Sequence, residues 1–242
     1  MKRHMYGILL FLIIGLALFG LLLALMHYNQ EKLIFHPEKL PSEYQYRMPG
    51  NFEEINFHPQ KNITLNALHF RVEKPRGVVL YFHGNAGSLA SWGEVAEQFT
   101  NRGYNAVFYD YRTYGKSNGR IVRERDFHRD AEFIYQELRK EYAAEDIVFY
   151  GRSLGTGIAA RLAVRHTPKF LVLETPYYNF IDVSTYHYSF VPAGRLLRYK
   201  FFTNRAIPKT ECPIYLIHGT KDQVVPYNSS PRLEALNPQC EL

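Results

Sequence analysis

A short segment bracketed by glycines, Gly151–Gly155, stands between a predicted strand and a predicted helix. The strand, residues 146–150, is rich in β-branched and aromatic side chains, whereas residues 156–163 are small and helix-forming. The segment reads Gly-Arg-Ser-Leu-Gly, and a G-x-S-x-G pattern at such a junction holds its serine at the tip of a tight turn. It predicts an α/β sheet with Ser153 as a nucleophile and the N–H of Leu154 pointing at a developing oxyanion.

The chain contains a second copy of the same pattern at Gly115–Gly119. Residues 110–114 separate this copy from the preceding apolar run, and the residues that follow it are bulky and charged. A phosphate-binding loop would need a glycine five residues before Gly115, where Asp110 stands. We therefore predict Ser153, and not Ser117, as the nucleophile.

Residues 8–26 contain no charged side chain and span about 28 Å as a helix, close to the thickness of a bilayer core. Lys2 and Arg3 precede the segment, which predicts a single-pass membrane anchor within residues 1–30. The same rule places the N-terminus in the cytoplasm and residues 31–242 on the non-cytoplasmic side, periplasmic or lumenal. A cleaved signal peptide is the alternative.

The chain is basic, with a formal net charge of +6 and a pI of about 9.2. The basic residues between positions 120 and 129 alternate with acidic ones, a pattern typical of a solvated face. We therefore expect no nucleic-acid partner. About 210 residues follow the anchor, enough for one α/β domain.

Apolar periodicity predicts strands that alternate with helices. The predicted strands are an antiparallel edge hairpin at 51–57 and 63–72, then 77–82, 104–109, 146–150, 170–173 and 214–217. The predicted helices are 91–100, 127–142, 156–166 and 230–236, with a long insert at 175–211. This order predicts a mostly parallel sheet covered by helices on both faces.

Four segments occur in the order typical of one large family. They are His83–Gly87, Asp110–Gly119, Gly151–Gly155 and His218–Pro226. Residues 30–242 resemble the α/β-hydrolase superfamily, a three-layer sandwich. More narrowly, they resemble membrane-anchored serine hydrolases that include depalmitoylases and lysophospholipase-like members. Thr113 departs from the family pattern, which often has glycine there, and the departure alters a surface loop without touching the chemistry.

The resemblance implies a catalytic site without cofactor or metal. Asn85, in the loop after the 77–82 strand, supplies a second oxyanion-hole N–H beside that of Leu154. An ordinary glycine-rich turn is the alternative for this loop. Asp222 is the triad acid that would support a histidine, with a turn aspartate and Asp182 as alternatives. Glu174 is expected to orient the serine turn.

The triad histidine is missing from its expected place. The family order is Ser, Asp, His, yet residues 223–242 contain no histidine. His83 and His218 belong to strand-end loops, where a structural role is expected. We predict that a final strand, a histidine-bearing loop and a helix are missing after Leu242. The alternatives are a naturally inactive relative and a substituted base, His187.

The insert at 175–211 is rich in aromatic residues. They predict a lid or an acyl-binding wall over the site, or else packing onto the sheet. The expected function is hydrolysis of carboxylic ester or thioester bonds in acyl or lipid substrates. The alternative is a catalytically inactive scaffold that binds a lipid or a protein at the membrane. Cys212 and Cys240 are expected to lie close together, with or without a disulfide.

Overall fold

An eight-stranded sheet forms the centre of the protein in the computed structural model, which describes residues 2–242. Its strand order is β10-β9-β8-β7-β4-β6-β3-β2. The strands are β2 (Asn51–Gln60), β3 (Ile63–Arg71), β4 (Val78–Phe82), β6 (Asn105–Tyr109), β7 (Ile147–Arg152), β8 (Leu171–Glu174), β9 (Ile214–Ile217) and β10 (Cys240–Glu241). The β2–β3 hairpin and the β3–β6 pair are antiparallel, and all other pairs are parallel.

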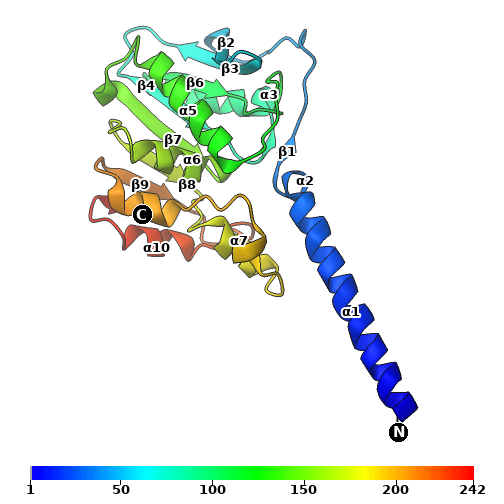
Figure 1. The fold of residues 1–242 in the computed structure, drawn as a ribbon. Coiled ribbons are helices and arrows are strands. Elements are labelled where there is room, and N and C mark those ends of the chain that lie inside the picture. Colours follow the sequence, from blue (N-terminus) through cyan, green and yellow to red (C-terminus); the bar gives the residue numbers. More distant parts are fainter. Residues whose placement is uncertain (1) are drawn as a thin grey trace.

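The central strands are buried on both faces, so their sequences are apolar throughout and do not alternate. One face is covered by α5 (Glu124–Leu138), α6 (Leu154–Ala163) and α10 (Ser229–Glu234). The other face is covered by α3 (Leu89–Trp92), η1 (Gly93–Ala96) and α4 (Glu97–Thr100). The predicted three-layer α/β sandwich is therefore confirmed, with α5 and α6 in front of the sheet in Figure 1.

Two predicted helices differ from those observed. The helix predicted at 91–100 starts earlier, at Leu89, and consists of three short pieces, α3, η1 and α4. Met48 packs against it at Gly93, where an added Cβ would lie 2.2 Å from the Met48 sulfur. The helix predicted at 127–142 starts earlier, at Glu124. The carboxylate of Asp126 accepts the N–H groups of Val122 and Arg123 and so caps the first turn.

The N-terminal residues form α1 (Lys2–Tyr28), and α2 (Gln30–Ile34) follows it. The apolar window of α1 is long enough to cross a membrane, and none of it is buried in the protein. Figure 1 shows α1 projecting away from the domain. After α2, β1 (His36–Pro37) pairs in parallel with β5 (Ala86–Gly87), an element that the sequence analysis did not predict.

The insert contains α7 (Phe180–His187), α8 (Ala193–Leu196), α9 (Thr203–Ala206) and η3 (Ile207–Lys209). Beyond it, β10 pairs with β9 and takes the edge of the sheet, so that Cys240 stands opposite Ile214. On β9, Tyr215 and Ile217 are 41% and 51% exposed. Cys212 and Cys240 are free thiols, so no disulfide joins them.

Candidate active site

Ser153 lies at a strained turn between β7 and α6. Its φ is +49°, a conformation that costs a non-glycine residue roughly 1–3 kcal/mol and therefore needs support from its surroundings. The Ser153 N–H donates to the carbonyl of Glu174 at 2.9 Å. The Ser153 carbonyl accepts from the N–H and the hydroxyl of Thr156, at 2.9 and 2.7 Å. The predicted turn is therefore present and held on both sides.

The two bracketing glycines are required by close backbone contacts. A Cβ at Gly155 would lie 2.0 Å from the carbonyl oxygen of Phe82, and a Cβ at Gly151 would lie 2.6 Å from that of Gly155. Neither contact can be relieved by moving a flexible side chain. The tight turn that the G-x-S-x-G pattern predicts is therefore present, and it depends on both glycines.

The loop after β4 passes beside Ser153. A Cβ at Gly84 would lie 3.9 Å from the Cβ of Ser153. The side chain of Asn85 donates to the carbonyl of Ile34 at 2.9 Å, and the backbone carbonyl of Asn85 accepts from Tyr114 Oη at 2.7 Å. Within residues 2–242, the backbone N–H groups of Asn85 and Leu154 have no hydrogen-bond acceptor. Both are therefore available to bind an oxyanion.

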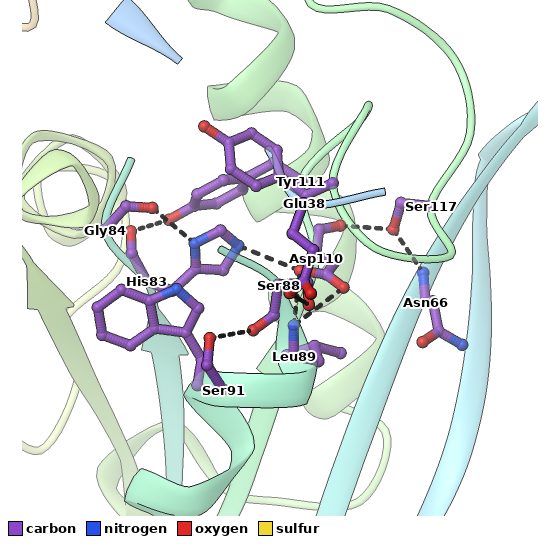
Figure 2. Close-up of polar contacts among 12 residues, drawn as sticks. Glu38, Asn66, His83, Gly84, Ser88, Leu89, Ser91, Asp110, Tyr111 and Ser117 are labelled. Carbon is purple, nitrogen blue, oxygen red and sulfur yellow. Dashed lines mark hydrogen bonds and ion pairs between the residues drawn. The ribbon is translucent and has the colours of Figure 1, made fainter. Parts of the chain in front are cut away.

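A buried polar cluster lies behind this loop (Figure 2). The Nδ1–H of His83 donates to the carbonyl of Gly84 at 2.7 Å, and its Nε2 lies 3.6 Å from Asp110 Oδ1. Tyr111 donates to the His83 carbonyl at 2.8 Å. Burial lowers the pKa of His83 to about 3 and raises that of Asp110 to about 8. His83 is thus a neutral, structural residue that fixes the loop, as predicted.

The second G-x-S-x-G pattern belongs to the same cluster. Ser117 is fully buried, and its hydroxyl donates to the carbonyl of Asp110 at 2.7 Å while accepting the N–H of Asn66 at 2.8 Å. Its hydrogen bonds are satisfied inside the protein, and no substrate can reach it. This geometry agrees with the prediction of Ser153, and not Ser117, as the candidate nucleophile.

Asp222 lies in the loop after β9. Its Oδ1 accepts the N–H groups of Val224 and Val225 at 2.8 and 2.9 Å, and its Oδ2 lies 3.7 Å from His218 Nε2. His218 itself is fixed by Ser230 Oγ at 2.7 Å. Asp222 therefore shapes the loop that carries Val224 and Val225, both of which line the cavity that contains Ser153.

The two other acids considered have different partners. Asp182 is paired with Arg232. Glu174 accepts a hydrogen bond from Tyr150 Oη at 3.0 Å and lies 3.3 Å from Arg152 Nε. Since its carbonyl also receives the Ser153 N–H, Glu174 orients the turn, in agreement with its predicted role.

Within residues 2–242, no histidine is hydrogen-bonded to Ser153. His187 lines the same cavity as Ser153, but its Nε2–H donates to the carbonyl of Val224 at 2.8 Å. The part of the chain that the structure describes thus brings together Ser153, Leu154 and Asn85 and does not complete a triad. The loop of Asp222 stands beside them.

The cavity at Ser153 has a volume of about 410 Å³ and a mostly apolar lining. The insert contributes Tyr177, Phe180 and Tyr188 to its walls. Tyr199 and Phe201 instead pack into the core. Some aromatic residues of the insert therefore line the cavity, and others pack onto the sheet.

Four lining residues at the end of α1 and in α2 were not predicted from the sequence: Met26, Gln30, Leu33 and Ile34. The apolar run 33–35, which continues after the charged pair Glu31 and Lys32, was the signal that could have identified the last two.

Comparison with known proteins identifies the family. Residues 73–193 match the family described as serine aminopeptidase, S33. An uncharacterised protein of Mycobacterium tuberculosis is 29% identical over 211 residues, covering 86% of this chain and 75% of the relative. The lysophosphatidylserine lipase ABHD12 of Danio rerio is 31% identical over 186 residues. That match covers 67% of this chain and 47% of the lipase, so the chain spans about half the length of this relative.

Solved structures show the same fold. The esterase Pf2001 of Pyrococcus furiosus matches with a TM-score of 0.64 and 20% identity, covering 86% of this chain and 87% of the esterase. Est1E of Butyrivibrio proteoclasticus, solved with ferulic acid, matches with a TM-score of 0.65 and 18% identity, covering 78% and 87%. The fold, the serine turn and the match over residues 73–193 agree, and the chain belongs to the α/β-hydrolase family.

Proposed function

We propose that this protein is a serine hydrolase of ester or thioester bonds in acyl and lipid substrates. The observation that carries the proposal is the strained Ser153 in an apolar cavity, beside the unpaired N–H groups of Asn85 and Leu154. A serine in this conformation is exposed to substrate and needs only a base to become nucleophilic. The similarity to a lipid lipase and to esterases supports the same substrate class.

In the proposed reaction, Ser153 Oγ attacks the acyl carbonyl carbon as a base accepts the hydroxyl proton. The N–H groups of Asn85 and Leu154 bind the oxyanion. Collapse of the intermediate breaks the bond to the alcohol or thiol, which leaves with the proton from the base. Water then attacks the acyl-enzyme and releases the carboxylic acid.

The base is the part of the site that needs a test of its own. In the family pattern, Asp222 supports a histidine that follows it in the chain, and that assignment stays a prediction. His187 is the described histidine that shares the cavity with Ser153, so it is the alternative base. If His187 is the base, His187→Gln lowers turnover by several orders of magnitude, as loss of a triad member does. If it is not, the variant keeps its turnover.

The test is release of fatty acid from lysophospholipids and from acyl thioesters by the full-length protein in detergent. We expect release that Ser153→Ala abolishes. Ser42→Ala is the control, because Ser42 is an exposed serine that does not line the cavity. Equal release by wild type and Ser153→Ala would contradict the proposal.

A second function, a catalytically inactive scaffold that binds lipid, is favoured by one observation. Within residues 2–242, no histidine is hydrogen-bonded to Ser153. A scaffold would bind lysophospholipid saturably and release no fatty acid. The same assay, with lipid binding measured in parallel, separates the two functions.

A further inference from the structure

The end of α1 and the start of α2 are docked onto the insert. The Nδ1–H of His27 donates to the carbonyl of Leu196 at 2.9 Å, and Gln30 Nε2 donates to the same carbonyl at 2.8 Å. The N–H of Arg198 donates back to Gln30 Oε1 at 2.8 Å. Because Gln30 is only 3% exposed, these bonds are shielded from water and hold the two segments in register.

Charged and aromatic contacts extend this junction. Glu31 accepts hydrogen bonds from Arg198 and from Tyr199 Oη, each at 2.7 Å. Phe35 is buried between Tyr199 and Phe127, with ring centroids 5.0 and 5.3 Å away. Residues 27–35 are therefore part of the folded domain and not a flexible linker between a membrane helix and the domain.

The cavity at Ser153 is closed on one side by this docked segment. Met26, Leu33 and Ile34 form that wall, and Leu196 and Leu197 of the insert adjoin it. The wall is mostly apolar, with Gln30 as its polar member, and it adjoins Asn85, whose side-chain amide donates to the Ile34 carbonyl at 2.9 Å. The serine turn and an apolar wall formed by the base of the predicted membrane helix and by α2 thus line one cavity.

We propose that residues 26–34 are the acyl-binding wall of the active site. We further propose that the substrate is a membrane-resident lipid with a single acyl chain, which enters from the bilayer between the base of α1 and α7. This rests on the proposed function and adds to it the substrate class and the route of entry. A volume of about 410 Å³ lies near the lower end of the range for ligand pockets, about 300–1,000 Å³, which favours one chain over two.

The surface beside the cavity fits contact with a membrane interface. Tyr186, Tyr188 and Phe190, at the end of α7 and just after it, are 62%, 52% and 61% exposed. Figure 1 shows α7 on the side of the domain from which α1 projects. Aromatic side chains are enriched at the level of lipid headgroups, so this surface fits a domain that rests on the bilayer with the cavity mouth at its surface.

The test uses full-length Ser153→Ala protein in phosphatidylcholine vesicles, so that no step depends on turnover. The probe is a lysophospholipid with a photoreactive diazirine at the end of its acyl chain. We expect adducts on residues 33 and 34 and on the cavity-lining residues Phe180 and Val183, all competed by unlabelled lysophospholipid. Adducts confined to residues 8–25, which contact bulk lipid, would overturn the proposal.

A pair of tryptophan substitutions makes the test specific. Leu33→Trp fills the cavity wall and should lower the competed adduct yield about tenfold. Leu25→Trp is the matched control, because Leu25 is similarly exposed, 52% against 55%, and does not line the cavity. Equal losses in both variants, or none, would overturn the proposal. Hydrolysis that depends on Ser153 without these adducts would refute the entry route alone and leave the proposed function intact.

Discussion

The hydroxyl of Tyr177 is hydrogen-bonded to the first turn of α6, directly after Ser153, and removing this hydroxyl should destabilise the protein measurably. Tyr177 is 1% exposed. Its hydroxyl donates to the carbonyl of Leu154 at 3.0 Å and accepts the N–H of Gly157 at 3.1 Å. The approach is close, because a Cβ at Gly157 would lie 2.2 Å from that oxygen. Tyr177→Phe removes both bonds and leaves the ring in place.

The expected cost follows from the groups left without a partner. A buried donor or acceptor that loses its hydrogen bond costs about 1–3 kcal/mol. We therefore expect the free energy of unfolding to fall by about 2 kcal/mol, and since each kcal/mol lowers Tm by about 2–4 °C in a chain of this size, Tm should fall by about 4–8 °C. The first turn of α6 should also loosen, which lowers turnover through the Leu154 N–H.

The assay is thermal unfolding of the full-length protein in one detergent, followed by circular dichroism. Tyr186→Phe is the matched control, because Tyr186 is 62% exposed and its change should stay within about 0.5 kcal/mol. If Tyr177→Phe unfolds at the same temperature as the control, the hydroxyl does not support the turn and the reasoning is wrong.

Three further predictions concern packing, a buried ion pair and pH. Gly155→Ala should prevent correct folding, because the added Cβ would collide with the Phe82 carbonyl. An added Cβ at Gly194 has nothing within 4 Å, so Gly194→Ala should stabilise α8 by up to about 1 kcal/mol. The soluble yield and the Tm of the two variants are the measurements. Arg112 donates to both carboxylate oxygens of buried Asp130, at 2.7 and 2.6 Å. Arg112→Met should therefore lower the free energy of unfolding, measured with denaturant, by about 3–5 kcal/mol. A double variant that also carries Asp130→Leu should recover part of this loss. Burial raises the pKa of Asp110 to about 8 from an unfolded value near 3.9, so its stabilising protonated form is lost as pH rises. The stability of wild type relative to Asp110→Asn should therefore fall between pH 4 and 8, and a flat difference across that window would contradict the burial argument.

The features that could be predicted from the sequence are those fixed by local sterics. The turn at Ser153 depends on Gly151 and Gly155, which have no side chain and so allow the backbone to pack closely on both sides of the serine. Both glycines can be read directly from the sequence. The β2–β3 hairpin likewise follows from alternation of polar and apolar residues, although β2 runs on to Gln60 through an irregularity in the ladder after Phe57.

The features that were missed depend on contacts between distant segments. Gly93 leaves room for Met48, since an added Cβ would lie 2.2 Å from the Met48 sulfur, and nothing near Gly93 in the sequence indicates this contact. The docking of residues 27–35 depends on hydrogen bonds to Leu196 and Arg198, far along the chain. For Asp222 the local spacing to His218, four residues earlier, was a signal that could have pointed to its observed neighbour.

The central claim is that Ser153 is an active nucleophile, and covalent labelling tests it most directly. Full-length protein in native membranes would be incubated with a fluorophosphonate probe, digested and mapped by mass spectrometry. The account predicts an adduct on the peptide that carries Ser153, absent from Ser153→Ala and retained in Ser42→Ala, a change at an exposed serine outside the cavity. An unlabelled wild-type protein, or an adduct on any other serine, would contradict it.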